Sequence, residues 1–221
     1  MHASRAISLA GLGLVLASAR ATAQNWDDSF KWFLGAQGGV IAYETQTQAR
    51  SWIPTAGGHL FIRAKRTGLL VSIDQAFASK GSLTGYTDVN APTGIRPVTF
   101  SSLRRYSAVL TGYPMRGSTQ PYFGLGFGLL QVVSPQPQGV FSSPAQFNLA
   151  QRLATQKSTD GFVSFVAGVE SRVSRWVLFG QYQLTSSQSA GNLLRGPSHG
   201  LTAGVRLNLG GAKEGIKGGG Y

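Results

Sequence analysis

The chain has 221 residues, a length that fits a single domain, and a formal net charge of +12 with only 13% charged residues. It contains no cysteine, which excludes disulfide bridges, thiol chemistry and lipid attachment through an N-terminal cysteine. In an exported chain, the positive charge is better matched by lipid head groups or lipopolysaccharide phosphates than by nucleic acid.

The first residues, 1–23, predict a cleaved secretory signal peptide. Arg5 supplies a basic start, and the apolar run 7–17 is too short to span a bilayer as a helix. Ala21-Thr22-Ala23 forms a cleavage site of the A-x-A type, and Ala17-Ser18-Ala19 forms a second candidate. No later segment has a long uncharged apolar run, which excludes a helical membrane protein.

After a polar lead at 24–31, the chain predicts eight β-strands. Apolar residues recur at every second position, which is the period of a strand whose two faces meet different surroundings. A strand of ~10 residues that rises ~3.3 Å per residue and tilts by ~40° covers about 25 Å, the height of the apolar band of a membrane barrel. The predicted strands are 32–43, 56–64, 68–78, 99–113, 121–133, 161–173, 176–184 and 199–209.

The connections between these strands alternate in length. The short ones are 65–67, 114–120 and 174–175. The long ones, rich in Ser, Gln, Gly and Pro, are 44–55, 79–98, 134–160 and 185–198. In an up-and-down arrangement, all the short turns fall at one end and all the long loops at the other. Transmembrane barrels have this asymmetry, with short periplasmic turns and long external loops.

The segment 121–133 has the sharpest contrast between its two faces. One face carries the large apolar residues Phe123, Leu125, Phe127 and Leu129. The other face carries Gly124, Gly126 and Gly128. Glycine is depleted in strands because it has no side chain to pack, so three on one face predict a wall that other groups approach closely, as in a narrow barrel.

The other strands repeat this division into an apolar face and a charged, glycine-containing face. A soluble lipocalin-like carrier would turn the charged face to water and the apolar face inward around a ligand. A membrane barrel would do the reverse. Glycine on the charged face, the sorted loop lengths and aromatic residues near strand ends favour the membrane barrel. These aromatic residues are Trp32, Tyr113, Tyr122, Trp176 and Tyr182.

Four stretches carry a family resemblance. LLVSIDQAFASKGS at 69–82 and RRYSAVLTGYPMRGSTQPYFGLGFGLLQVV at 104–133 resemble the bacterial outer-membrane β-barrel domain family, which is related to opacity-type small porins. The shared pattern is a strand ending in Lys-Gly, a strand that stops at Tyr-Pro, a short turn, and Pro-Tyr followed by Gly-x-Gly. FVAGVESRV at 165–173 and LTAGVRLNL at 201–209 resemble its late strands. The resemblance covers most of residues 32–209 and implies an eight-stranded barrel in the outer membrane.

Six charged residues on the glycine-rich face form the candidate site. They would line an ion path if the lumen were open, but eight strands leave an interior that side chains nearly fill. The favoured interpretation is therefore a structural network in which the charges neutralise one another, with Asp74 and Arg105 as cross-strand partners. The six residues are Arg63, Asp74, Arg105, Glu170, Arg172 and Arg206.

Motifs for catalysis or cofactor binding are weak. The Gly124-x-Gly126-x-Gly128 pattern has neither the spacing of a dinucleotide fingerprint nor the Lys-Ser/Thr of a P-loop. After signal removal only His59 and His199 remain, on opposite predicted faces and without a Gly-x-Ser-x-Gly motif. Two histidines without a carboxylate cluster make a poor metal site. We expect no enzymatic activity, no cofactor and no metal.

The sequence thus predicts an all-β chain with a signal peptide at 1–23, an eight-stranded antiparallel up-and-down transmembrane β-barrel at 24–210 and a glycine-rich tail at 211–221. The expected location is the outer membrane, and the expected function is structural or surface-interacting, through four external loops. A narrow pore for small solutes, a lipid-modifying enzyme and a soluble periplasmic carrier are the alternatives. The expected partners of this monomer are outer-membrane lipid, lipopolysaccharide and the barrel-insertion machinery, and not nucleic acid.

Overall fold

The computed structural model describes residues 29–189 and 191–213. The predicted signal peptide lies outside the described residues, and so do residues 214–221 of the predicted tail. No helix within the described ranges has both the length and the apolar character that are needed to cross a membrane.

The described residues form nine β-strands and one α-helix. Eight strands are long, and the remaining one, β6, has two residues. The elements are β1 (Ser29–Thr45), β2 (Ser51–Arg63), β3 (Thr67–Thr87), β4 (Ile95–Gly112), β5 (Thr119–Val133), β6 (Gln136–Pro137), α1 (Pro144–Gln156), β7 (Thr159–Val173), β8 (Trp176–Thr185) and β9 (Leu194–Lys213).

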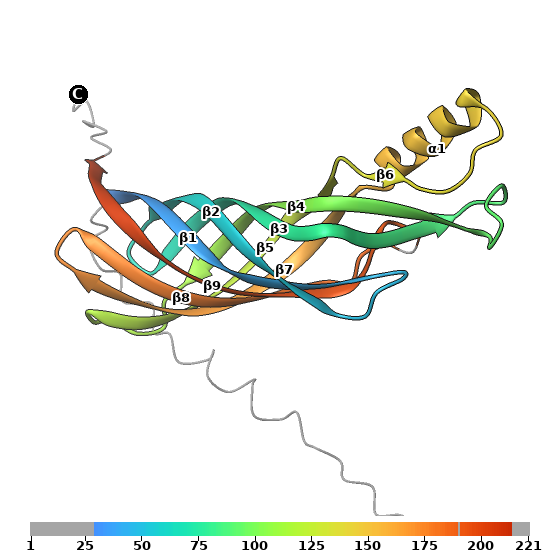
Figure 1. Cartoon of the computed structure of the whole chain (residues 1–221). Helices are drawn as coiled ribbons and strands as arrows, with labels where there is room; N and C mark the ends of the chain where they lie inside the picture. Colours follow the sequence, from blue (N-terminus) through green and yellow to red (C-terminus); the bar gives the residue numbers. More distant parts are fainter. Residues whose placement is uncertain (1–28, 190, 214–221) are drawn as a thin grey trace, which may run out of the picture.

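The eight long strands form one closed antiparallel barrel, as the sequence predicts. Each pairs with its neighbours along the chain, and β9 pairs back with β1. The β3–β4 pairing completes the circle. The short strand β6 pairs with Val98 and Thr99, near the beginning of β4. Figure 1 shows a tilted cylinder in which β3 and β4 project at the end where α1 lies. Closure pairs the backbone groups within the wall, a condition for any β-structure that crosses a bilayer.

Side chains alternate across the barrel wall with the predicted parity. On β5, the outward Leu125 and Phe127 are 66% and 70% exposed, whereas the inward Tyr122 and Leu130 are buried. Such large exposed apolar side chains recur on every barrel strand, far beyond what the surface of a soluble monomer carries. This exterior is the reverse of a lipocalin-like carrier, and the structure thereby contradicts the carrier alternative.

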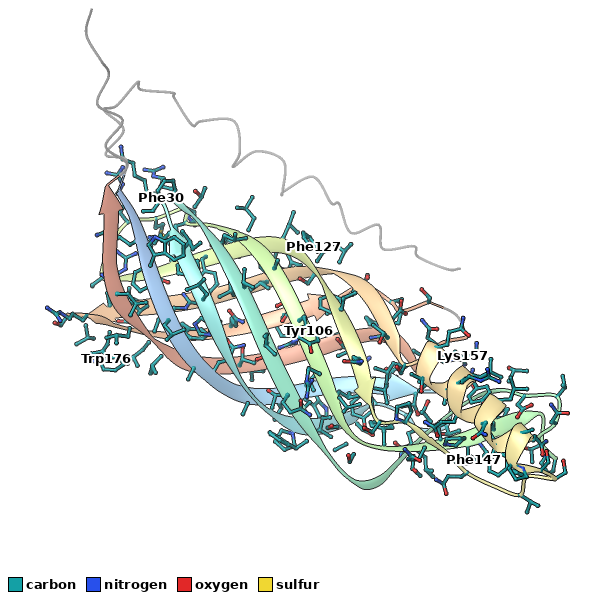
Figure 2. All side chains as sticks on the ribbon, turned by 90° about the horizontal axis from the view of Figure 1, so that it is seen from above. Phe30, Tyr106, Phe127, Phe147, Lys157 and Trp176 are labelled. Atoms are coloured by element: carbon teal, nitrogen blue, oxygen red, sulfur yellow. The ribbon has the colours of Figure 1, made fainter. Side chains whose placement is uncertain are left out.

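The two ends of the barrel differ. The turn end carries the connections 64–66, 113–118 and 174–175, and the loop end carries the other four. Trp176 and Phe147 mark these opposite ends in Figure 2. Inside, one apolar cluster that includes Phe61 and Tyr113 lies toward the turn end. A second cluster at the loop end joins barrel residues to Ala154 of α1 and to Leu193 of the β8–β9 connection.

The predicted loop boundaries are wrong at the loop end. A loop over 79–98 is predicted, but β3 continues to Thr87 and β4 begins at Ile95, which leaves only 88–94. Likewise, 46–50 replaces the predicted loop 44–55. On these strand extensions the outward positions include Thr87, Pro97 and Thr99, so the regular apolar alternation of the barrel wall is lost and hydropathy gives no clear strand signal. Backbone pairing with the neighbouring strand makes them strands nevertheless.

The helix α1 lies within the connection 134–158, where only a loop is predicted. Ser143 is its N-cap and accepts a hydrogen bond from the Gln146 amide at 3.2 Å, and Pro144 opens the first turn. Ser143-x-x-Gln146 has the spacing of a capping box, so a helix-start signal is present in a segment that composition marks as a loop.

Candidate functional site

All six predicted site residues come together in the barrel interior, from five different strands. Five of them are at most 7% exposed, and the side chain of Arg172, toward the turn end, is 35% exposed. Each takes part in at least one ion pair, so the fold gathers charges that are far apart in the sequence.

Glu170 on β7 is the centre of the larger group of charges. Its Oε1 accepts hydrogen bonds from Nη1 of Arg63 and, at 3.2 Å, from Nη2 of Arg172. Its Oε2 accepts a hydrogen bond from Nη1 of Arg206 at 3.1 Å. One buried carboxylate therefore faces three guanidinium groups, two of which are themselves nearly inaccessible.

Neutral side chains complete the shell around Glu170. The hydroxyl of Tyr113 donates to Oε2 at 3.0 Å, and Nε2 of Gln120 donates to Oε1 at 2.9 Å. A carboxylate can accept several hydrogen bonds, and a buried one is stable only when they are supplied. The two oxygens of Glu170 accept five such bonds in all, so the carboxyl group is fully hydrogen-bonded although it is only 1% exposed.

The placement of Tyr113 and Tyr122 in an aromatic girdle is wrong. Both rings are buried inside the barrel, where Tyr122 donates to Oε1 of Gln181 at 2.8 Å and Tyr113 donates to Glu170. Their parity already assigned them to the charged face, and this signal is stronger than their closeness to a strand end. Trp32 and Trp176, on the opposite parity, are 38% and 51% exposed near the turn end.

Arg206 on β9 links several lumen groups. Its Nε donates to Nε2 of His59 at 3.1 Å, while its guanidinium lies 4.1 Å from the ring centroid of Phe179 and 4.6 Å from that of Phe61. Stacking on aromatic faces offsets part of the cost of removing the cation from water. The planar group also reaches His59 and Glu170 at once, which a lysine ammonium cannot do in the same geometry.

The second group of charges is centred on Asp74. Asp74 and Arg105 lie directly opposite each other on β3 and β4, as the sequence predicts. Oδ2 of Asp74 accepts from Nε of Arg105 at 3.2 Å and from Nη2 at 2.9 Å, while Gln37 donates to Oδ1. Both charged side chains are at most 3% exposed.

The lumen charges do not balance. Four guanidinium groups, from Arg63, Arg105, Arg172 and Arg206, face the two carboxylates of Asp74 and Glu170, which leaves 4 − 2 = 2 positive charges in excess. Several buried polar atoms also have no protein partner within the described residues. They include Nη1 of Arg105, Nδ1 of His59, Nε2 of Gln183 and Oγ1 of Thr202. Buried polar atoms are normally hydrogen-bonded, so these atoms favour a partly hydrated interior.

The glycine face of β5 is in close contact with its surroundings. A Cβ at Gly126 would overlap the backbone of β4 at Ala108, and one at Gly128 would overlap the backbone oxygen of Tyr106 and the ring of Phe162. This is the close approach that the sequence pattern predicts. It is a packing role and gives no support for phosphate binding.

The two histidines lie apart. His59 is buried in the lumen, whereas His199 is partly exposed, with its Nδ1 2.6 Å from the hydroxyl of Tyr182. Among the described residues, no hydrogen bond joins either histidine to a serine or a carboxylate, so the hydrogen-bonded chain of a hydrolase triad is not seen there. Residues 29–189 and 191–213 also contain no group of three or more His, Cys, Asp or Glu able to hold a metal ion.

The loop end carries a second organised region, the loop-end assembly, which consists of residues 83–100, the segment 134–158 and the β8–β9 connection. Arg96, which is 1% exposed, joins its parts. Its Nε donates to Oδ2 of Asp88 at 2.8 Å, its Nη1 donates to the carbonyl of Val140 at 3.3 Å, and its guanidinium lies over the ring of Phe141. Arg96 thereby joins the tip of the β3–β4 hairpin, residues 88–94, to the segment that contains α1.

Two further contacts fix the same assembly. The buried hydroxyl of Tyr86 donates to the carbonyl of Ala150 in α1 at 3.0 Å. The amide of Leu193 donates to the carbonyl of Lys157 at 3.1 Å, and Leu193 belongs to the loop-end core. The β3–β4, β5–β7 and β8–β9 connections therefore form one packed structure rather than separate loops.

No protein-family model matches the chain, and no curated protein sequence matches it significantly. Among solved structures, it is similar to Neisserial surface protein A (NspA), with a TM-score of 0.53 and 14% identity over 80% of this chain and 96% of that one. Weaker similarities link it to Ail of Yersinia pestis, solved with the heparin analogue sucrose octasulfate (TM-score 0.38, 11% identity, 81% and 98% covered). The same holds for the outer membrane protein OprG from Pseudomonas aeruginosa (TM-score 0.39, 10% identity, 81% and 93% covered). The chain therefore has the fold of the eight-stranded outer-membrane β-barrels, of which NspA is an example.

Proposed function

We infer that this protein resides in the outer membrane, where a barrel filled by side chains anchors the loop-end assembly at the cell surface. The observation that carries this inference is the inverted distribution of polarity. Leu110, Leu125, Phe127 and Val163 project outward with 63–70% of their surface exposed, while Glu170 and Arg206 are buried inside at 1%. A lipid environment makes such an exterior favourable.

The loop-end assembly supports a role in surface contacts. It is held together by contacts of Arg96 and Tyr86. It also exposes apolar side chains, since Val89 is 93% exposed and Val140 is 85% exposed. Binding residues are disproportionately found on connections that a rigid scaffold positions. We propose that this end faces outward and the turn end faces the periplasm, in agreement with the usual orientation of such barrels.

Electrophoretic mobility tests the membrane barrel. A folded membrane barrel extracted in detergent resists unfolding by SDS until it is boiled, so unheated and boiled samples should migrate differently. Cell fractionation should recover the protein with the outer membrane. Identical mobility before and after boiling, together with solubility in buffer alone, would falsify the proposal.

Protease treatment of intact cells tests the orientation. The segments 88–94 and 134–158 should be cut, because they lie at the proposed outer end. Lys65, Arg66 and Arg116, in the turns, should be protected until the cells are opened. Cleavage at these turn residues in intact cells would reverse the orientation.

Deletion of the helical segment separates a surface role from a purely structural one. Replacing 139–156 by a short Gly-Ser linker removes α1 and leaves the strand pairings of the barrel wall in place. A strain that lacks the protein is complemented with either chain, and its resistance to detergent is compared. Full rescue by the shortened chain would leave the barrel with a structural role alone.

A narrow pore is the second candidate, favoured by the unpartnered polar atoms of the lumen, such as Nη1 of Arg105 and Nδ1 of His59. Planar-bilayer recordings test it directly. Discrete conductance that changes in an Asp74→Ala variant would establish the pore, and an electrically silent bilayer would support a filled barrel.

Lipid, lipopolysaccharide and the insertion machinery remain the proposed partners of a monomeric barrel, and light scattering in detergent would measure the oligomeric state. We also propose that the protein is not an enzyme. A lipid-product assay that compares the wild type with His59→Ala and His199→Ala variants tests this, because histidine-dependent turnover would overturn it.

A further inference from the structure

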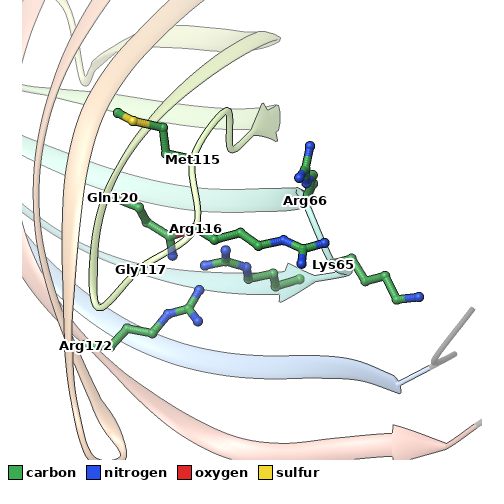
Figure 3. A pocket seen from close by; sticks show the side chains of 8 residues that line it. Lys65, Arg66, Met115, Arg116, Gly117, Gln120 and Arg172 are labelled. Carbon is green, nitrogen blue, oxygen red and sulfur yellow. The ribbon is translucent and has the colours of Figure 1, made fainter. Parts of the chain in front are cut away.

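The turn end of the barrel opens into a strongly basic cavity. The cavity has a volume of about 440 Å³ and is lined by five cationic side chains, from Arg63, Lys65, Arg66, Arg116 and Arg172. Figure 3 shows Lys65, Arg66, Arg116 and Arg172 grouped around it, with Gln120 beside them. No carboxylate belongs to the lining found in the described part of the chain.

The fold builds this cavity from three separate places. Lys65 and Arg66 belong to the β2–β3 turn, and Arg116 belongs to the β4–β5 turn. Arg63 ends β2, and Arg172 stands one residue before the end of β7. Barrel closure brings all of them to one mouth, although Arg63 and Arg172 are more than a hundred positions apart along the chain.

The deeper wall of the cavity explains why an anion is favoured there. Arg63 and Arg172 both donate to Glu170, which also serves Arg206, so this carboxylate is shared by three guanidinium groups. Nε of Arg172 is buried without a partner in the described residues. An excess of buried positive charge is costly, and an external anion at the mouth would offset it.

The chemistry of the lining indicates the kind of anion. Guanidinium groups are planar forks that bind phosphate oxygens in pairs, and several of them can share the oxygens of one phosphate. The volume of about 440 Å³ accepts a phosphate together with the atoms attached to it, within the range of small-ligand sites.

We propose that the turn-end mouth is a phosphate-binding site that takes a phosphate monoester or diester. Two sources share this chemistry: the phosphate of an anionic lipid head group in the adjacent leaflet, and a soluble phosphate compound. Arg63, Arg172 and Gln120 form the floor of the site, and Lys65, Arg66 and Arg116 form its rim.

Calorimetric titration of the full-length folded barrel in a phosphate-free detergent tests the proposal. One arm uses inorganic phosphate, and the other uses a short-chain phosphatidylglycerol. Saturable binding of inorganic phosphate identifies a soluble source, and binding of the lipid alone identifies the head group. Both results support the site. If neither probe saturates, the proposal is overturned.

Matched variants show where binding occurs. Arg66→Gln and Arg116→Gln each remove one charge-assisted contact, so each should weaken binding by about tenfold. Arg175→Gln removes one charge from the exposed β7–β8 turn at the same end but outside the cavity, and it should bind as the wild type does. All three residues lie in exposed turns, and unchanged electrophoretic mobility verifies that each variant is folded. Equal weakening in all three variants would indicate diffuse attraction and overturn the site.

The inference goes beyond the proposed surface role. The titration needs only the folded barrel in detergent, so its failure would leave that role and its orientation untouched.

Discussion

Replacing Glu170 by glutamine tests whether the lumen network stabilises the barrel. Glutamine keeps the shape of the side chain but removes the charge that faces Arg63, Arg172 and Arg206. The Arg172 side chain is 35% exposed, so its pair contributes at most about 1 kcal/mol. Arg63 and Arg206 are 8% and 1% exposed, and removing one partner of a buried pair typically costs about 3–5 kcal/mol. We therefore expect Glu170→Gln to lower the free energy of unfolding by about 3–5 kcal/mol.

Urea unfolding of the barrel in detergent or lipid vesicles, followed by tryptophan fluorescence and electrophoretic mobility, measures this loss. Val71→Ala is the control, since Val71 faces outward at 43% exposure and its truncation leaves a space that lipid fills, at a cost of about 1 kcal/mol. Adding Arg206→Gln to Glu170→Gln removes one of the unbalanced cations, so the double variant should lose less than the sum of the single losses.

Additive losses within about 0.5 kcal/mol would refute the reasoning, because they would show that Glu170 and Arg206 do not interact. A Glu170→Gln loss no larger than that of Val71→Ala would do the same. It would mean that the guanidinium groups are adequately solvated without the carboxylate.

Three further predictions follow from the same geometry. Asp74→Ala should destabilise the barrel by about 3–5 kcal/mol, and Arg105→Ala added to it should restore part of the loss in the same unfolding assay. Gly128→Ala should cost about 1–3 kcal/mol because its Cβ meets backbone, whereas Gly112→Ala, with open space at the Cβ, should be neutral; equal effects would contradict the close approach. Burial raises the pKa of Asp88, but hydrogen bonds from the Asn90 amide and the Arg96 guanidinium outweigh it and hold the pKa below its ordinary value of 3.8. The stability that Asp88 gives the hairpin tip is therefore present above pH 3.8 and lost as the pH falls through the lowered pKa. Protease cutting at 88–94 should therefore increase below that pKa in the wild type and stay constant over the same pH range in Asp88→Asn.

Local sequence pattern predicts much of the barrel. Period-two alternation determined the number of barrel strands and the face that each residue occupies, as Phe127 outside and Gly128 inside demonstrate. This works because a bilayer accepts only apolar side chains on the outer face of a strand, whereas the inner face holds charge and glycine. The pairing of Asp74 with Arg105 was predictable for a related reason. Asp74 and Arg105 share the charged face of consecutive strands and lie at similar distances from the predicted loop. Their exact register also depends on the irregularity between Phe77 and Ser82, which takes up the unequal lengths of the two strand extensions.

The extended strands and the packed helix at the loop end were not predicted from local pattern. The extended parts of β3 and β4 carry polar residues such as Thr87 and Thr99 on their outer face, so the apolar contrast that marks a membrane strand is lost and the long β3–β4 hairpin resembled a polar loop. Helix α1 is held by the Tyr86 hydroxyl and by a core that includes Ala154, and these contacts exist only after the connections have packed together.

The contacts of Glu170 with Arg63 and Arg206 were decided by the closed barrel alone. Parity assigns Glu170 and Arg63 to the interior, but they are 107 positions apart, on strands that are not neighbours. Their contact depends on how far each strand is shifted along the next around the whole circle and on the tilt that this shift imposes. No single segment of the sequence specifies the register shift added up over all the strands of the barrel. The sequence therefore determined which charges enter the barrel, and the tertiary structure decided which of them meet.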